Sequence, residues 1–344
     1  MSKLLIVRSK IHDPWYNLAL EEYLIEVFQA GIKDREFSAI LYLWQNLDTV
    51  VIGRNQNAWA ECLASLLEAE GGRLARRSTG GGAVFHDLGN LNFSLILPRR
   101  KFDLKTNFEM IIKAVASQGV IAEQNGRNDI LADGRKFSGN AFSLRQEVGL
   151  HHGTLLINSD YARVARYLTV SPAKLKAKGV ASVQSRIINL CEINQTVSVA
   201  AMMNAMEEAF RAQFGSKSHV QRTTNEKYEN ERRLSELYEQ HASWNWRFGE
   251  TIQFDAAVEK QMAWGGVNLG FQINQGIITR VTTYSDALDC DFLQSIADNL
   301  QGRRFHSVEI AAAILRTPGQ HQNLGPSREQ MVQDLAELVM EQQW

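Results

Sequence analysis

RRSTGGGAVFHDLGN occupies residues 76–90, where an arginine pair and three glycines precede a short apolar run. Glycine weakens strand interiors, so this run is typical of a backbone that passes very close to another group. The free N–H groups of such a loop can bind an anion, and Arg77 beside it can bind a phosphate or carboxylate. The alternative is a flexible hairpin loop with solvated arginines. The motif is neither a Walker loop nor a G-x-G-x-x-G turn.

A second informative stretch is GRNDILADGRKFSGNAF, residues 126–142. Asp133-Gly134 predicts a hairpin turn between strands at 129–132 and 135–142. Lys136 therefore follows the turn, where a lysine taken alone is predicted to be solvated. Gly139 predicts a bulge or a close approach of another group.

Two further segments carry residues that could serve a site. HHGTLLI, residues 151–157, predicts a strand whose two histidines more often satisfy hydrogen bonds than catalyse. No cysteine or carboxylate is spaced to form a recognisable triad with them. The segment 171–186 is basic and interrupted by Pro172 and Gly179. Two interpretations are about equally supported: a solvated loop, or a mobile lid that covers a phosphate-bearing ligand.

Composition predicts an ordinary cytoplasmic protein of two domains. The chain has 344 residues, of which 44% are hydrophobic and 22% charged. A net charge of −1 gives no basic field for nucleic acid or anionic membranes. The three cysteines are far apart, which fits a reducing compartment. The N-terminal apolar run, Leu4 to Val7, is too short for a signal peptide.

Patterning places the expected elements of the first part of the chain. Asp13-Pro14 predicts the start of a helix over 15–28. Asn17, Glu21 and Glu22 are expected on its solvated face. The other expected elements are a hairpin formed by strands 39–44 and 49–52, and helices over 59–69, 106–118 and 197–214.

The polar stretch 216–242 is predicted to be a linker that carries one exposed helix, over about 225–240. We expect a domain over 1–243, including this linker region, and a second over 244–344. In the second, antiparallel strands are predicted from Trp244 onward. They precede helices near 290–300, 307–315 and 326–342.

Taken in order, these motifs and KLKAKGVASVQSR (174–186) resemble the lipoate–protein ligase family. DPWYNLALEE (13–22), TVVIGRNQN (49–57) and WNWRFG (244–249) also match. The resemblance covers nearly the whole chain and is weakest in 216–240 and after about 300. It implies an α+β fold. A biotin/lipoate ligase-like catalytic domain with a mixed β-sheet and flanking helices would be followed by a smaller α+β C-terminal domain.

The resemblance implies a reaction in two steps. Lipoate and ATP would give lipoyl-adenylate and pyrophosphate, with Mg²⁺ held largely through the substrate phosphates and Asp129 as the one candidate protein ligand. The lipoyl group would then pass to a lysine of an apo lipoyl domain, with release of AMP. The implied acceptors are the lipoyl domains of 2-oxo-acid dehydrogenase acyltransferase subunits and the glycine cleavage H protein.

The resemblance also implies residue roles. Lys136 would be the catalytic residue, placed against both the lipoyl carbonyl and the phosphate. The segment 174–186 would cover the adenylate. The implied ATP and lipoyl-adenylate site consists of Arg77, Gly82, Ala83, Val84, Phe85, Asn128, Asp129 and Lys136. The implied lipoate site consists of Gly80, Gly81, Lys136 and His152.

Four other functions are weighed against ATP-dependent ligation. A transferase that uses octanoyl carrier protein through a thioester needs a cysteine nucleophile. Leu150, and not a cysteine, precedes the histidine pair. A transferase that accepts only preformed lipoyl-adenylate would keep the same fold. A non-catalytic lipoate-binding paralogue is disfavoured by the intact Arg77, glycine run and Lys136. Biotin ligation is disfavoured because that family's glycine- and arginine-rich loop differs.

Overall fold

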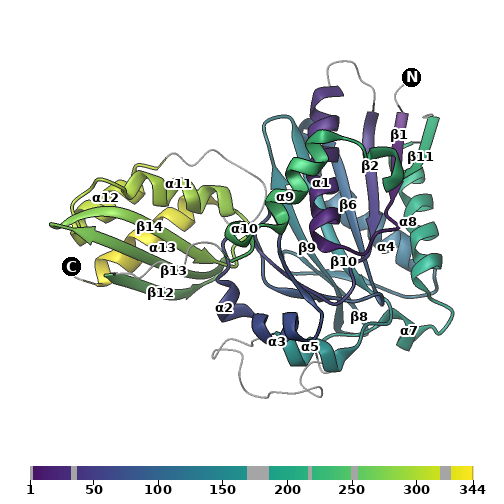
Figure 1. Ribbon diagram of the computed structural model, residues 1–344, viewed down its shortest axis with the longest axis horizontal. Helices are drawn as coiled ribbons and strands as arrows, with labels where there is room; N and C mark the ends of the chain where they lie inside the picture. The colour runs from purple at the N-terminus through teal and green to yellow at the C-terminus, as the bar shows by residue number, and fades with distance from the viewer. Residues whose placement is uncertain are drawn as a thin grey trace. The chain divides into compact units, whose positions relative to one another are not determined.

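The computed structural model describes residues 3–31, 37–168, 186–215, 219–248, 255–317, 327–342 and 344. The chain forms two compact units, coloured along the chain in Figure 1. The first unit comprises Met1–Ile52, Ala58–Arg76 and Ala83–Arg247. The second comprises Gly53–Asn57, Arg77–Gly82 and Phe248–Trp344. Among the described residues, no helix has the length and apolar character needed to cross a membrane.

An eight-stranded mixed sheet is the centre of the first unit. β1 runs parallel to both of its neighbours, and the remaining neighbours are antiparallel. In spatial order the strands are β11 (His219–Thr224), β1 (Lys3–Arg8), β2 (Phe37–Trp44), β6 (Asn90–Pro98), β10 (Val148–Leu156), β9 (Arg135–Leu144), β8 (Asp129–Ala132) and β7 (Glu123–Asn125).

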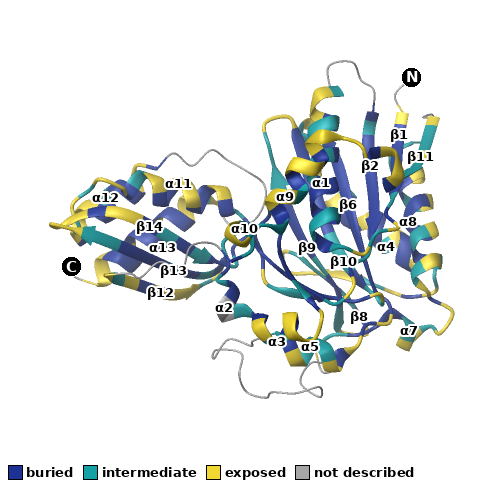
Figure 2. Cartoon of the chain, in the orientation of Figure 1, coloured by how far each residue is buried: buried dark blue, intermediate teal, exposed yellow. Residues whose placement is uncertain are grey.

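Helices cover both faces of this sheet. α1 (Pro14–Gly31) and α9 (Arg232–Ala242) pack together on one face, while α4 (Leu104–Ala116) and α8 (Val199–Phe214) pack together on the other (Figure 1). β2 and β6 are therefore buried along almost their whole length, as their dark blue colour shows in Figure 2. The predicted mixed sheet with flanking helices is confirmed.

Shorter elements complete the first unit. A second, three-stranded sheet has the order β4 (Arg73–Arg76), β3 (Thr49–Ile52) and β5 (Val84–His86). The short helices are α2 (Ala58–Glu61), α3 (Ala64–Ala69), α5 (Tyr161–Tyr167), α7 (Leu190–Ile193) and α10 (Trp244–Phe248). Within the described part of this unit, two 3-10 turns occupy Arg99–Lys101 and Asn225–Tyr228.

The hairpin predicted over 39–52 is wrong, because β2 and β3 belong to different sheets. The connection is anchored by the buried Asn46. Its amide oxygen accepts from Asn17 Nδ2 at 3.0 Å, and its amide nitrogen lies 3.2 Å from Nδ1 of His86. These tertiary partners turn the chain away from β2. Asparagine is common in turns, but Asn46 is a buried link between α1 and β5.

The single helix predicted over 59–69 is also wrong, because α2 and α3 are separated at Cys62 and Leu63. The backbone N–H of Leu63 donates to the carbonyl of Tyr167 at 3.0 Å, and Cys62 forms an isolated bridge with Leu168. Pairing with a distant segment thus replaces the helical hydrogen bonds at this point.

The predicted linker over 216–242 is not an exposed connection. Within its described part, β11 pairs in parallel with β1 at the sheet edge, and α9 packs on α1. Leu234 and Leu237 are buried in the core shared with α1, and Arg233 forms an ion pair with Glu26 at 2.8 Å. The segment is strongly polar, and its amphipathic helix was therefore predicted to be exposed. Its two leucines, three residues apart, face the core.

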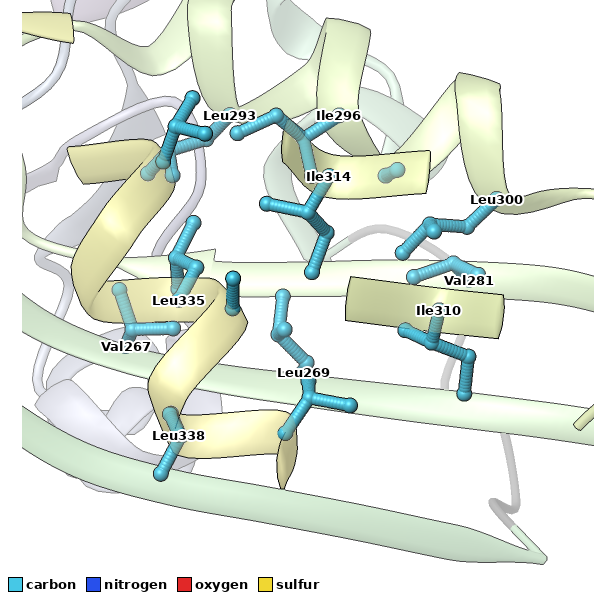
Figure 3. Packing of buried hydrophobic residues seen from close by; sticks show 14 of the residues in the cluster. Val267, Leu269, Val281, Leu293, Ile296, Leu300, Ile310, Ile314, Leu335 and Leu338 are labelled. Atoms are coloured by element: carbon cyan, nitrogen blue, oxygen red, sulfur yellow. The ribbon is translucent and has the colours of Figure 1, made fainter. Parts of the chain in front are cut away.

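The second unit is a three-stranded antiparallel sheet with three helices packed against it. Its strands are β12 (Ala256–Met262), β13 (Gly265–Asn274) and β14 (Ile277–Ser285), and its helices are α11 (Cys290–Leu300), α12 (Ser307–Leu315) and α13 (Arg328–Glu341). Figure 3 shows the aliphatic side chains that fill the space between sheet and helices. The predicted smaller α+β domain is confirmed.

One element at the start of this part differs from the expectation. Trp244–Phe248 was predicted as a strand and is the short helix α10. Ser243 begins it, since its hydroxyl accepts from the N–H of Trp246 at 3.2 Å and its carbonyl accepts from that of Arg247 at 3.1 Å. Residues 249–254 lie outside the described part of the chain.

We predict that Leu237→Ala lowers the free energy of unfolding of the first unit by about 2–5 kcal/mol, because it leaves a cavity between α9 and α1. Hydrogen exchange of the α1 and α9 amides measures this loss in the first unit alone. Glu239→Ala, an exposed change on the same helix, is the control and should have little effect. Equal exchange in both variants would mean that α9 contributes no packing.

Candidate active site

The β8–β9 hairpin positions Lys136. Asp133 and Gly134 have φ angles of 51° and 68°, as a tight two-residue turn requires, so the predicted hairpin is confirmed. The register shifts across the hairpin: Asp129 pairs with Gly139, but Leu131 pairs with Lys136. The additional residue on β9 is a bulge, which re-aims nearby side chains. Lys136 Nζ lies 2.7 Å from Asp129 Oδ1.

The surroundings of Lys136 hold both its side chain and its backbone. A Cβ built at Gly139 would lie 3.2 Å from both Cε and Nζ of Lys136, so the glycine leaves room for the lysine. The Lys136 N–H donates to the carbonyl of Arg186 at 2.9 Å, and its own carbonyl accepts from the N–H of Ile188 at 2.9 Å. With 35% of its side chain exposed, Lys136 is held in place and still accessible. It is not a freely solvated surface lysine.

His152, on β10, is buried beside the carboxylate of Glu21 on α1. His152 Nδ1 lies 2.8 Å and 3.0 Å from the two carboxylate oxygens, and because these only accept, Nδ1 is the donor. The hydroxyl of Ser94 also donates to Glu21, and Trp44 Nε1 donates to that hydroxyl at 3.1 Å. The chain of contacts joins α1, β2, β6 and β10 at one point.

The charge of Glu21 is maintained inside the protein. Burial acts to raise the pKa of this carboxyl group, but His152 and the hydrogen bonds from His152 and Ser94 outweigh it, so the pKa lies below its ordinary value. Only 2% of the residue is exposed. A buried carboxylate with this many donors can orient His152 firmly.

The prediction that Asn17, Glu21 and Glu22 lie on a solvated helix face is wrong. Asn17 is buried and accepts from the hydroxyls of Tyr42, at 2.8 Å, and Ser9, at 2.7 Å. Glu22 forms a two-bond pair with Arg145, at 2.5 and 2.6 Å. Their burial could have been predicted from spacing, because Asn17 and Glu21 lie four residues apart, on the same helix face as the buried apolar residues.

His151, adjacent to His152 on β10, points into an aromatic cluster. Its ring centroid lies 5.4 Å from that of Phe93, 5.1 Å from Phe108 and 4.6 Å from Phe142. Burial, and then the charge of His152, hold the pKa of His151 well below its ordinary value. His151 is therefore a neutral donor or acceptor near pH 7.

The glycine run lies in the second unit, where Arg77 is folded into its own loop. The buried guanidinium donates to the carbonyl of Gly80 at 2.7 Å and to that of Gly82 at 2.8 Å. Gly81 has a φ of 93°, in the region that favours glycine. In this conformation Arg77 organises the backbone of the loop.

Two glycines of the second unit allow close backbone packing. A Cβ at Gly80 would lie 2.0 Å from the carbonyl oxygen of Ala287, and one at Gly53 would lie 2.1 Å from that of Gly81. The N–H of Gly81 also donates to the carbonyl of Ala287, at 3.2 Å. The close approach predicted from the glycine run is thus made, among the described residues, by the chain's own backbone.

The predicted site residues therefore divide between the units, each described on its own. The first unit holds Lys136, Asp129, Asn128, His152 and the segment 83–85. In that segment Phe85 is buried and stacks on Tyr167, with ring centroids 5.6 Å apart. The second unit holds Arg77, Gly80, Gly81 and Gly82. Lys174, Lys176 and Lys178, in the expected adenylate-covering segment, lie outside the described residues.

The cysteine side chains are poor nucleophiles. Burial, followed by nearby carboxylates, raises the pKa of Cys62 to about 12, and burial raises that of Cys290 to about 11. The pKa of Cys191 is also raised, mainly by burial. All three thiols remain protonated at neutral pH, whereas thioester chemistry needs a thiolate. Within the described part of the chain, no three histidine, cysteine or acidic side chains group to hold a metal.

Comparison with known proteins defines the class of this fold and site. Residues 13–211 match the lipoyl protein ligase A/B catalytic domain, and residues 251–335 match the bacterial lipoate protein ligase C-terminus. A lipoate-protein ligase A from Psychrobacter cryohalolentis is 38% identical over 315 residues, covering 90% of this chain and 91% of that protein.

Solved structures of lipoate ligases also resemble this fold. LipL1 of P. falciparum in complex with lipoate has a TM-score of 0.84 at 26% identity, covering 99% of this chain and all of that one. A bipartite lipoate protein ligase from Thermoplasma acidophilum, described with its E2 lipoyl domain, gives 0.63 at 25%, covering 74% and 100%. A lipoate-protein ligase A bound with ATP gives 0.59 at 27%, covering 72% and 99%. The chain belongs to the lipoate–protein ligase A family.

We predict that the protein loses stability as the pH falls below about 6.5, the ordinary pKa of histidine. His151 and His241 both have lowered pKa values, so the unfolded chain binds protons there that the folded chain does not. Each such histidine makes the free energy of unfolding fall by about 1.4 kcal/mol per pH unit. In urea denaturation from pH 7 to 5.5, His151→Gln should show a slope shallower by about that amount. An unchanged slope would contradict a neutral His151.

Proposed function

We propose that this protein activates free lipoate with ATP and transfers the lipoyl group to a lysine of an apo lipoyl domain. The observation that carries the proposal is the placement of Lys136, held beside Asp129 on a hairpin and accessible to ligand. Membership of the lipoate–protein ligase family supports it, as do similar proteins described with lipoate and with ATP.

In the first step, a carboxylate oxygen of lipoate attacks the α-phosphorus of ATP and the bond to pyrophosphate breaks. Both reactants are anions, so fixed positive charge is needed to bring them together. The ammonium of Lys136 supplies a compact charge with three donors, which can bridge a lipoate oxygen and an α-phosphate oxygen. Asp129 holds it in place until the substrate oxygens bind.

In the second step, the amine of the acceptor lysine attacks the carbonyl carbon of lipoyl-adenylate. The bond between that carbon and the AMP oxygen breaks, and the nitrogen gives up a proton. Lys136 stabilises the oxyanion that develops on the carbonyl oxygen. The proposed acceptors are lipoyl domains of 2-oxo-acid dehydrogenase acyltransferase subunits and the glycine cleavage H protein. The proposed compartment is the cytoplasm.

Magnesium fits this site as a companion of ATP. It keeps several waters and binds through one or two carboxylates together with substrate phosphates, so it needs no cluster of protein ligands. Asp129 is the carboxylate placed to contribute, with 32% of its side chain exposed. When bound, the ion would offset the charge of the phosphates. We assign the rest of the nucleotide site to Asn128, Arg77 and the backbone from Gly82 to Phe85.

We assign the lipoate site to Gly80, Gly81 and His152, together with Lys136. The domain division that accompanies this function is 1–243 for catalysis and 244–344 as an accessory part. The raised pKa values of the cysteine thiols count against a transferase that works through a protein thioester. A transferase that uses only preformed lipoyl-adenylate differs from the proposed ligase because it does not catalyse the first step.

The proposal is tested by ATP–pyrophosphate exchange with lipoate, octanoate or biotin, followed by ligation to an apo lipoyl domain. We expect lipoate-dependent exchange, a lipoylated domain and AMP in equal amounts, all dependent on Mg²⁺. Transfer from supplied lipoyl-adenylate without any exchange would indicate the adenylate-only transferase. Absence of both activities would reject the proposal.

We predict that Lys136→Ala slows both half-reactions by about a hundredfold to a thousandfold, because each loses a donor to developing negative charge. Lys136→Arg should not restore either rate, since a planar fork cannot replace a compact ammonium. Single-turnover kinetics of exchange and of transfer from lipoyl-adenylate measure the two losses. Lys105→Ala, an exposed lysine on α4, is the control. A folded Lys136→Ala protein with near wild-type rates would show that Lys136 is not catalytic.

A further inference from the structure

Asn140 is a buried side chain on β9 that ties down the turn before Asp129. Its backbone N–H donates to the carbonyl of Asn128 at 2.9 Å, and its side-chain amide donates to the same oxygen at 3.0 Å. In return, Asn128 Nδ2 donates to the carbonyl of Asn140 at 3.2 Å. Three hydrogen bonds therefore join one residue of β9 to one residue of the turn.

The hydrogen bonds fix which way the Asn140 amide faces. A backbone carbonyl can only accept, so the amide nitrogen must face Asn128, where it also donates to the hydroxyl of Ser138 at 3.1 Å. The amide oxygen then faces His151, whose Nε2 lies 2.9 Å away. Because this oxygen only accepts, Nε2 of His151 must carry the proton. The neutral histidine, buried among aromatic rings, thus donates to Asn140 Oδ1 and supports this orientation of the amide.

A glycine makes room for this arrangement. A Cβ at Gly153 would lie 2.5 Å from Asn140 Oδ1 and 2.9 Å from the carbonyl oxygen of Gly139. Next to it, the hydroxyl of Thr154 accepts from the N–H of Gly139 at 3.2 Å. The sequence motifs SGN (138–140) and HHGT (151–154) therefore interlock across β9 and β10.

The turn, residues 126–128, also connects β7 to β8, which pair antiparallel with Asn125 opposite Asp129. β7, which precedes it, is a three-residue edge strand whose residues are all exposed. Gly126 adopts a φ of 59°, and no atom lies near the position of its missing Cβ. The bonds from Asn140 thus link Asn128, next to Asp129, to a strand that lies further inside the sheet.

We propose that Asn140 is a positioning residue for the activation step. It holds Asn128 and Asp129 where the nucleotide binds, in an orientation that His151 supports through its Nε2 proton. This rests on the nucleotide-side assignment of Asn128 and Asp129 in the proposed function. Asn140 itself faces His151, Ser138 and Asn128, and so acts through other residues.

The first test compares Asn140→Ala and Asn140→Asp with the wild-type protein in ATP–pyrophosphate exchange. Both changes remove the side-chain donor to Asn128 but keep the backbone one, and the loss of one hydrogen bond corresponds to a change of up to about tenfold. We expect the KM for ATP to rise by about that factor while the KM for lipoate changes less than about twofold. Calorimetric titration with ATP should show the same loss of affinity in the absence of turnover.

Ile130→Val is the matched control for general destabilisation. Ile130 is buried in β8, one residue beyond Asp129, and makes no contact assigned to substrate. Its variant should melt at a lower temperature but keep both KM values near those of the wild-type protein. An equal rise in KM for ATP in this control would show that loss of stability alone explains Asn140→Ala, and would overturn the proposal.

A second pair of variants tests the role of His151 without altering Asn140. Glutamine can place an N–H near the position of Nε2, whereas phenylalanine preserves the aromatic packing but donates nothing. We expect His151→Phe to raise the KM for ATP about as much as Asn140→Ala, and His151→Gln to restore it to within about threefold of the wild-type value. Should Asn140→Ala fail to fold, this comparison decides the matter.

The outcomes separate this inference from the proposed function. If the wild-type protein shows lipoate-dependent exchange but the variants keep its KM for ATP, Asn140 has no positioning role and the ligase assignment stands. If His151→Phe and His151→Gln behave alike, the proton on Nε2 does not orient Asn140. If the wild-type protein neither binds ATP nor catalyses exchange, the proposed function fails, and the assignment to Asn140 fails with it.

Discussion

The buried carboxylate of Glu21 is the constraint on which the first unit depends. It lies at the meeting point of α1, β6 and β10 and accepts hydrogen bonds from His152 and Ser94. Removing a partner would leave an uncompensated charge in the interior, which is far more costly than losing an ordinary contact. The position of α1 on the sheet and the orientation of His152 are therefore determined together. A residue proposed for lipoate binding is held by the same contact that holds the helix.

Glycines set the distances at which the other functional segments meet. Gly139 leaves space for Lys136, Gly153 leaves space for the amide of Asn140, and Gly80 allows the backbone at Ala287 to approach. In each case a methyl group would meet an atom at 3.2 Å or less. The glycines of the motifs are thus explained by steric limits more than by flexibility. They let polar side chains and backbone atoms occupy positions that strands normally exclude.

Local chemistry made some features predictable. Asp133-Gly134 predicted a hairpin because few other residue pairs adopt its turn angles, and Gly139 predicted the irregularity found beside it. The wrong predictions of secondary structure arose where contacts with residues distant in sequence outweigh local preferences. Asn46 is a residue type common in turns, but in the fold it is buried and contacts Asn17 and His86. The stretch that forms β11 and α9 looked like a linker because its many charges concealed the few side chains that pack on α1.

By itself, the sequence determined the family, the α+β class and the hairpin that carries Lys136, because these depend on short motifs and local turn chemistry. Only the tertiary structure decided that Glu21 is buried, that Arg77 binds its own loop and that His151 donates to Asn140. The physical reason is that burial and hydrogen-bond partners depend on how the fold brings segments together, as it does for Glu21 and His152 across 131 positions of the sequence. No local pattern specifies which buried polar group will meet which donor.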